Sequence, residues 1–148
     1  MTERFSNVYD DESRAAAYAK LEIPGTYYLA YRDLPRIIGA HVRGGLALDF
    51  GCGTGRSTRF LRAQGFDAVG VDIAERMLAR ARQLDPRGEY RLVPDGGLGE
   101  VEAGTYDLVL SVFTFDNIPT MEKKAALFRS LGNAMKPDGR IVSLVSAP

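Results

Sequence analysis

After Gly45, short apolar runs alternate with stretches of helical periodicity, and this alternation strongly limits the folds open to the chain. The candidate strands are Leu46–Phe50, Ala68–Ile73, Tyr90–Pro94, Tyr106–Phe113 and Arg140–Val145. Such alternation is typical of βαβ units, in which right-handed crossovers make successive strands parallel. The sequence therefore predicts an α/β fold: an open, doubly wound parallel sheet of about five strands, Rossmann-like, with three α/β/α layers.

Stretches of helical periodicity connect these strands and precede them. The stretch after the second candidate strand carries one apolar stripe, formed by Ala74, Met77, Leu78, Ala81 and Leu84. A last helix is predicted over residues 119–135, and its sheet-facing residues would be Ala125, Phe128, Leu131 and Met135, before a turn at residues 136–139. The first 45 residues are also predicted to be helical, with one helix over residues 10–23. We expect one domain over residues 1–148, with an N-terminal helical extension (1–45) before an α/β core (46–148).

Composition excludes several classes of function. Nineteen basic residues balance nineteen acidic ones, so no net positive charge is available to hold a nucleic-acid backbone or an anionic membrane. One cysteine and one histidine exclude a disulfide framework and argue against a His/Cys metal site, which needs three or four ligands. The amino terminus has no apolar signal region, and no 18-residue apolar run follows it. We expect a cytoplasmic protein with no membrane segment, no metal ion and no nucleic-acid partner.

A glycine-rich loop follows the first candidate strand, at a strand end where ligands bind in such sheets. Its small residues are Gly51, Cys52, Gly53 and Gly55. Glycines allow sharp turns and close approach to a ligand, and free amides at the start of the next helix can bind a carboxylate. Arg56 stands where a dinucleotide-binding loop has its third glycine, and Asp49 disfavours a pyrophosphate but can attract an ammonium group. The loop by itself could serve only a tight turn, but with Asp49 it favours a ligand that carries an amine and a carboxylate.

Two further carboxylates follow neighbouring strands. Asp72 closes the second candidate strand, where it could accept both hydroxyls of a ribose or cap the helix that begins at Ala74. Asp95 and Gly96 end the third strand, where they could read an adenine edge or simply form a turn.

Together these features resemble the class I S-adenosylmethionine-dependent methyltransferases, particularly the small-molecule group with the motif LDxGCGTG. The matching segments are Leu48–Gly55 (LDFGCGTG), Val69–Ile73 (VGVDI), Pro94–Gly96 (PDG), Tyr106–Phe113 (YDLVLSVF) and Leu131–Ile141 (LGNAMKPDGRI). The resemblance implies S-adenosyl-L-methionine as the cofactor and S-adenosyl-L-homocysteine as the product. It also implies a set of cofactor-binding residues: Asp49 near the ammonium, Gly51, Cys52 and Gly53 along the methionyl end, Asp72 on the ribose, Ile73 and Met77 beside the adenine, Asp95 and Gly96 at its polar edge, and Ser111, through its backbone, near the sulfonium.

Candidate acceptor-binding residues lie after the fourth strand and in the N-terminal extension. Phe113 and Asp116 follow the strand, although Phe113 could equally be a core residue and Asp116 a helix cap. By similarity, residues 1–45 would form a lid with Tyr18 and Tyr28 as wall residues. Methyl transfer is an in-line displacement that needs no protein nucleophile, so no catalytic residue is assigned. His41 precedes the first strand and is expected at the opposite end of the sheet.

The chain departs from the family pattern at its end, because it stops before the two strands that normally complete the sheet. The fifth strand is therefore expected at an exposed edge, where it could pair with a second copy in a homodimer.

The sequence thus predicts an S-adenosylmethionine-dependent methyltransferase that acts on a small molecule. A nonenzymatic S-adenosylmethionine-binding or interaction module is the alternative, because the sheet is short. An NAD-dependent oxidoreductase is a weaker alternative, because Arg56 replaces the third glycine of the dinucleotide motif.

Overall fold

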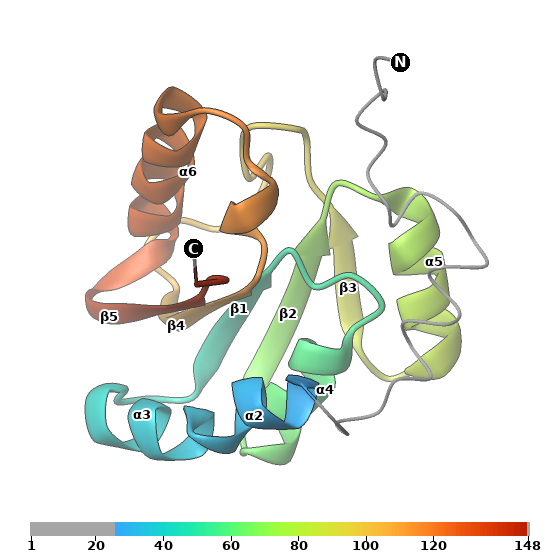
Figure 1. Cartoon of the computed structure of the whole chain (residues 1–148), viewed down its shortest axis with the longest axis vertical. Coiled ribbons are helices and arrows are strands. Elements are labelled where there is room, and N and C mark those ends of the chain that lie inside the picture. Colours follow the sequence, from blue (N-terminus) through green and yellow to red (C-terminus); the bar gives the residue numbers. More distant parts are fainter. Residues whose placement is uncertain (1–25, 148) are drawn as a thin grey trace.

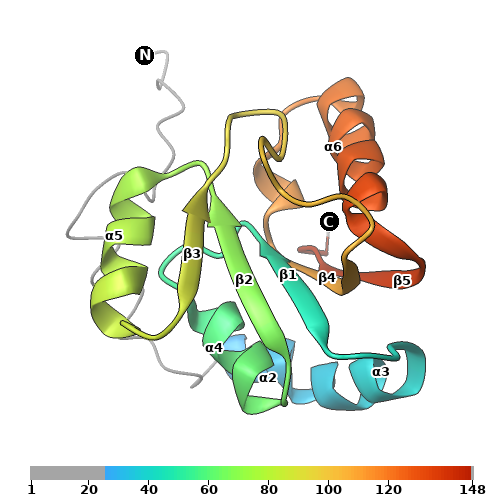
Figure 2. The ribbon, with the colours of Figure 1, turned by 180° about the vertical axis from the view of Figure 1, so that it is seen from behind.

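The computed structural model describes residues 26–147 and is built around one five-stranded parallel sheet with the order β3-β2-β1-β4-β5. The strands are β1 (Leu46–Phe50), β2 (Asp67–Asp72), β3 (Glu89–Leu92), β4 (Tyr106–Val112) and β5 (Met135–Leu144). The helices are α2 (Thr26–Arg32), α3 (Leu34–His41), α4 (Arg56–Ala63), α5 (Glu75–Leu84), the 3-10 helix η1 (Phe115–Asn117) and α6 (Met121–Ala134). Figures 1 and 2 show the open, twisted sheet with helices around it. The predicted fold class is confirmed.

Side chains of the central strands alternate between the two faces of the sheet, and both faces are covered. On one face, Ala47 of β1 packs with Leu34 of α3 and Leu61 of α4. On the other face, Leu48 of β1 packs with Leu131 of α6. Burial on both faces explains why β1 reads as an apolar run rather than as an alternating pattern.

Helix α5 lies along β3 and follows the sequence prediction closely. Of its predicted stripe, only Leu84 is exposed, and the helix ends there, before Asp85 and Pro86. Leu78 and Ala81 pack with Tyr90 of β3.

The sheet-facing side of α6 differs from the prediction. The hydroxyl of Thr120 accepts a hydrogen bond from the Lys123 amide and starts the helix at Met121. The buried positions are Leu127, Leu131 and Ala134, whereas Phe128 is 42% exposed. The prediction is confirmed for Leu131 and is wrong for Ala125 and Phe128, which are exposed. Apolar residues lie on two sides of this helix, and only the position of the sheet selects one of them.

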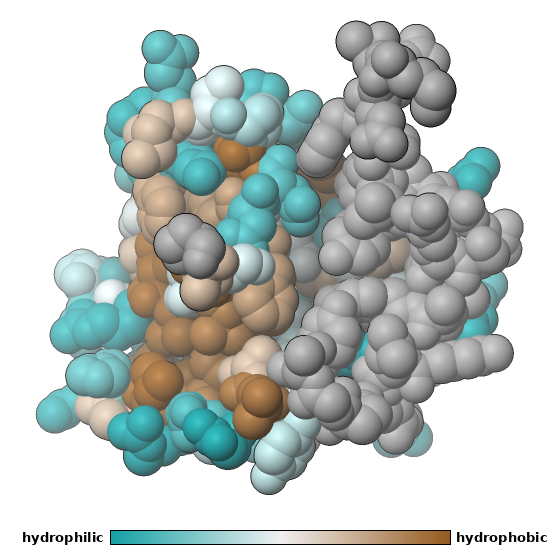
Figure 3. Space-filling view, viewed as in Figure 1, coloured by the Kyte–Doolittle hydropathy of each residue, from teal (hydrophilic) through white to brown (hydrophobic). Residues whose placement is uncertain are grey.

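Strand β5 begins at Met135, before the predicted residue 140. The turn predicted at residues 136–139 is therefore an irregular part of this strand. Tyr106 of β4 pairs with Met135, and Leu108 then pairs with Arg140, so residues 136–139 bulge out of register. Within the described residues, β5 pairs only with β4 and forms one edge of the sheet, as predicted. Apolar side chains gather over β4 and β5 in Figure 3, and Val142 and Leu144 of this surface are only partly buried.

The N-terminal extension is described only from residue 26, where α2 and α3 confirm helical structure. The predicted helix over residues 10–23 lies outside the described residues. Among residues 26–147, no helix combines the length and the apolar character that a bilayer span requires.

Candidate functional site

A cavity of about 350 Å³ opens at the carboxyl ends of β1, β2 and β4. The chain runs from β1 outward to β2 and β3 and then returns to β4 on the other side of β1, so the cavity lies at the point where the strand order reverses. Open α/β sheets bind their ligands at this point. The cavity is lined by residues of several elements: Tyr31, Phe50, Gly51, Cys52, Gly53, Arg56, Ser57, Asp72, Ile73, Met77, Val93, Pro94, Asp95, Gly96, Gly97, Val112, Phe113, Thr114, Asn117, Ile118, Pro119, Lys123 and Leu127.

The glycine-rich loop forms one wall of the cavity and requires its glycines for conformation and for space. Gly51, Gly53 and Gly55 have φ of 79°, 55° and 88°, in the left-handed region that side chains disfavour. A Cβ atom on Gly51 would lie 2.1 Å from Oγ1 of Thr114. The Thr114 hydroxyl in turn donates to the carbonyl of Phe50 at 2.9 Å, so the loop is tied to the end of β4.

Backbone amides of this loop are engaged within the protein. The amides of Gly51 and Cys52 both donate to the carbonyl of Val71, at 2.9 and 3.0 Å. The Gly53 amide donates to Asp72 Oδ2 at 2.8 Å, and the Gly55 amide donates to the carbonyl of Cys52 at 2.9 Å. These four amides are therefore not free for a ligand, because the loop folds back onto β2. The sequence places its free donors at the start of the following helix, and that expectation stays a prediction.

Asp49 lies beneath the loop, fully buried, and does not line the cavity. Its Oδ2 accepts hydrogen bonds from the hydroxyls of Ser57 and Thr58, at 2.5 and 2.7 Å. Burial raises the pKa of Asp49 to about 6, although the two hydroxyl bonds oppose this shift. Asp49 therefore orders the loop against α4, and its predicted contact with an ammonium group stays a prediction.

Cys52 fills space between the loop and β2. It is buried, and burial raises the pKa of its thiol. A buried thiol is a poor nucleophile, so Cys52 acts as a small apolar residue of the wall.

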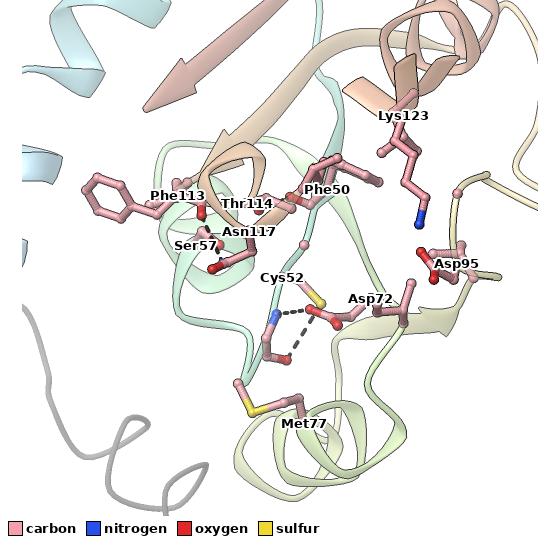
Figure 4. Close-up of a pocket in the computed structure, with 18 of the residues that line it drawn as sticks. Phe50, Cys52, Ser57, Asp72, Met77, Asp95, Phe113, Thr114, Asn117 and Lys123 are labelled. Carbon is pink, nitrogen blue, oxygen red and sulfur yellow. Dashed lines mark hydrogen bonds between the residues drawn. The ribbon is translucent and has the colours of Figure 1, made fainter. Parts of the chain in front are cut away.

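Asp72 connects the loop to the end of β2 and lines the cavity. Its Oδ2 accepts from the Gly53 amide (Figure 4), and its Oδ1 accepts from the Ala74 amide at 2.9 Å, before α5. Asp72 is not the N-cap that the sequence predicts, because α5 begins at Glu75 and Ala74 is its N-cap; Asp72 instead binds the amide of that N-cap residue. An ionised carboxylate offers about four lone-pair positions, so these two bonds leave acceptor capacity toward the cavity.

The far end of the cavity combines apolar and acidic groups. Ile73 is 49% exposed, whereas Met77 is buried, and both line the cavity. Asp95 and Gly96 also line this end, and their predicted contact with an adenine edge stays a prediction. Lys123 extends from the start of α6 toward Asp95 (Figure 4).

The segment after β4 holds Phe113 in an unusual conformation. Its φ of 59° is the only positive value among the described non-glycine residues. The Phe113 amide donates to the carbonyl of Leu144, and its carbonyl accepts from Asn117 Nδ2 at 3.3 Å. Phe113 lines the cavity, with its ring turned away from Cys52 and Asp72 (Figure 4). Such strain persists where the surrounding structure imposes it, and it often marks a ligand site.

Several other predicted residues lie outside the cavity lining. Asp116 accepts hydrogen bonds from the Ser146 amide and hydroxyl, and Tyr28 is 55% exposed on α2. Ser111 is fully buried within β4 and is not among the lining residues. Its predicted backbone contact near the sulfonium stays a prediction. Tyr18 lies outside the described residues. His41 ends α3, ahead of β1, as expected.

Sequence reasoning did not assign Tyr31, Arg56 or Lys123 to the site, although all three line it. Tyr31 is buried, with its ring 5.0 Å from that of Phe60 of α4. Tyrosine enrichment in the N-terminal extension was the available signal for Tyr31. Arg56 stood out only as a missing glycine, and nothing in the sequence distinguished Lys123 from neighbouring surface lysines.

The comparisons with known proteins agree on one family. Residues 23–148 match the family described as "Methyltransferase domain". A ubiquinone biosynthesis O-methyltransferase of Bordetella avium is 30% identical over 106 residues, which cover 69% of this chain and 43% of that protein. The chain therefore spans less than half the length of this curated relative.

Solved structures show the same likeness. An S-adenosylmethionine dependent methyltransferase from Mesorhizobium loti has a TM-score of 0.64 at 30% identity, covering 77% of this chain and 52% of that one. DesVI of Streptomyces venezuelae has a TM-score of 0.75 at 22% identity, covering 92% and 58%, and supports the fold. By its match over most of its length, this chain belongs to the methyltransferase-domain family.

Proposed function

We propose that this chain binds S-adenosylmethionine and takes part in methyl transfer to a small molecule. One observation carries the proposal: the cavity at the strand-order reversal brings together the glycine loop, Asp72 and the pair Ile73 and Asp95. In that order they suit an amino-acid tail, a ribose and an adenine. Family membership and the name of the Mesorhizobium loti neighbour support this ligand.

The residues present fit such a ligand. Asp72 has acceptor capacity for two vicinal hydroxyls and would repel a 2′-phosphate. The exposed Ile73 offers an apolar surface to a flat base, and the Asp95 carboxylate can accept from an exocyclic amine. A volume of about 350 Å³ lies within the range of small-molecule sites.

When bound, S-adenosylmethionine supplies a methyl group activated by a positively charged sulfur. The chain contributes by aligning the acceptor with this group and by excluding water. Tyr31, Val112 and Phe113 form an apolar wall suited to both tasks. The Phe113 amide donates to the Leu144 carbonyl of β5, and its carbonyl accepts from Asn117 of η1, so this part of the wall is preorganised.

The acceptor is proposed to be a small molecule with a hydroxyl group. The relative from Bordetella avium is named an O-methyltransferase, and this name supports an oxygen atom as the methyl acceptor. A formal net charge of zero supports the absence of a nucleic-acid partner. A cytoplasmic location and a homodimer formed through the β5 edge remain parts of the proposal, supported by the low cysteine content and by the position of β5.

The first experiment measures binding by isothermal titration calorimetry with S-adenosylhomocysteine. We expect Asp72→Asn to weaken binding about 10- to 100-fold, because hydrogen bonds to the ribose lose their charged acceptor. Asp116→Asn is the matched control, since Asp116 also accepts a backbone amide but does not line the cavity. Equal losses in both variants would argue against a ribose at Asp72.

The second experiment measures transfer of a labelled methyl group to a panel of phenols and other small hydroxyl compounds. Binding without transfer to any acceptor would favour a nonenzymatic binding module. A thermal shift with NAD that exceeds the shift with S-adenosylhomocysteine would favour an oxidoreductase instead.

A further inference from the structure

The methionyl tail of the proposed ligand carries a carboxylate, and the structure limits what can bind it. In related loops, free backbone amides often hold an anionic group. Here the amides of Gly51, Cys52, Gly53 and Gly55 all donate to acceptors of the protein itself. These four amides are thus engaged, and amides at the start of α4 carry only partial charges. A full positive charge at this wall has to come from a side chain.

Arg56 is the cation at this wall. It is the first residue of α4, directly after Gly55, and it lines the cavity while being only 6% exposed. Its neighbour Ser57 is not available as a donor, because its hydroxyl already donates to Asp49. Lys123, the other cation among the described lining residues, extends toward Asp95, away from Cys52 of the glycine loop (Figure 4).

A buried guanidinium is costly unless anionic or hydrogen-bonding groups surround it. Its planar group has five N–H donors and matches a carboxylate through two parallel hydrogen bonds. These donors are numerous enough to serve a ligand in addition to contacts within the protein. The position, burial and shape of Arg56 therefore suit a carboxylate that enters along the glycine loop.

We propose that Arg56 binds the α-carboxylate of the methionyl tail and thereby selects the intact amino-acid cofactor. This inference rests on the proposed function. It assigns recognition of the carboxylate to the side chain of Arg56 rather than to the amides of the glycine loop. It also assigns a ligand-binding function to the residue that stands in place of the third glycine of a dinucleotide-binding loop.

The test compares two ligands that differ only in this carboxylate: S-adenosylmethionine and its decarboxylated form. Calorimetry on the full chain measures both affinities for the wild type and for Arg56→Gln. We expect Arg56→Gln to lose about 10- to 100-fold in affinity for S-adenosylmethionine, as for a hydrogen bond to a charged group, and less than about 2-fold for the decarboxylated ligand. Arg56→Lys should recover part of the loss, because it restores the charge but not the two-pronged geometry.

Arg36→Gln is the matched control, because Arg36 is exposed on α3, away from the cavity lining, and should leave both affinities unchanged. Circular dichroism melting establishes that each variant is folded. Equal losses for the two ligands would show that Arg56 only supports the fold, and unchanged affinity for S-adenosylmethionine would equally overturn the inference. A raised KM for the acceptor at unchanged cofactor affinity would assign Arg56 to the acceptor instead. If the wild type binds neither ligand, the proposed function itself fails.

Discussion

Replacing the buried Asp49 with asparagine tests the electrostatics beneath the glycine loop. Asp49 is fully buried and is held by the hydroxyls of Ser57 and Thr58, and its Oδ1 has no hydrogen-bond partner among the described residues. Burial raises its pKa from 3.8 to about 6, and the charge of Asp72 adds to the shift. The asparagine variant keeps an oxygen acceptor for both hydroxyls but has no charge to bury.

The sign of the effect follows from this raised pKa. The folded protein binds the proton more tightly than the unfolded chain, so the stabilisation is fully present below about pH 4 and is lost as pH rises through 6. A shift of about two pKa units corresponds to about 3 kcal/mol. Relative to the wild type, the free energy of unfolding of Asp49→Asn should therefore increase by about 3 kcal/mol between pH 4 and pH 8.

Urea denaturation followed by circular dichroism measures this difference at several pH values. Other carboxyl groups titrate in both proteins, so their contributions largely cancel in the difference. A difference that stays constant within about 0.5 kcal/mol from pH 4 to pH 8 would refute the raised pKa and the electrostatic reasoning behind it.

Two further predictions concern packing. Tyr90→Phe removes a buried hydroxyl that donates to Asp85 Oδ2 at 2.5 Å, so we expect a loss of about 1.5 to 3 kcal/mol in unfolding free energy, while Tyr28→Phe at an exposed position should change it little. Similar effects for the two tyrosines would contradict the role of the Asp85 contact. Leu127→Ala should lower the free energy of unfolding by about 2 to 5 kcal/mol, because it removes buried side-chain volume under α6, whereas Ala125→Ser should change it by less than about 0.5 kcal/mol. Thermal melts that show the larger loss for Ala125→Ser would support the helix face predicted from the sequence.

The parts of the fold that the sequence predicted well depend on local signals. The bounds of β1 agree because Gly45 and Gly51 punctuate an apolar run. Helix α5 agrees because its apolar residues share a single face and Asp85-Pro86 ends it. In α6 apolar residues occupy two faces, and periodicity by itself could not choose between Leu127 and Phe128.

The site was predictable to the extent that strand ends converge in a parallel sheet. The glycine loop, Asp72 and Asp95 follow three such ends and do line one cavity. Tyr31 and Lys123 reach the same cavity from helices, and their direction depends on how each helix is rotated and docked. Asp116 was a reasonable candidate by position, but its carboxylate turns to Ser146, which is 30 residues away in sequence.

The sequence by itself determined the class of fold and the strand ends at which a ligand can bind, because periodicity and glycine punctuation act over a few residues. Only the tertiary structure decided which groups at those ends are still available. The amides of Gly51 and Cys52 donate to the Val71 carbonyl and the Gly53 amide donates to Asp72, while Asp49 is buried under α4. The physical reason is that hydrogen-bond partners and burial depend on segments far apart in the chain, whose pairing no local pattern records.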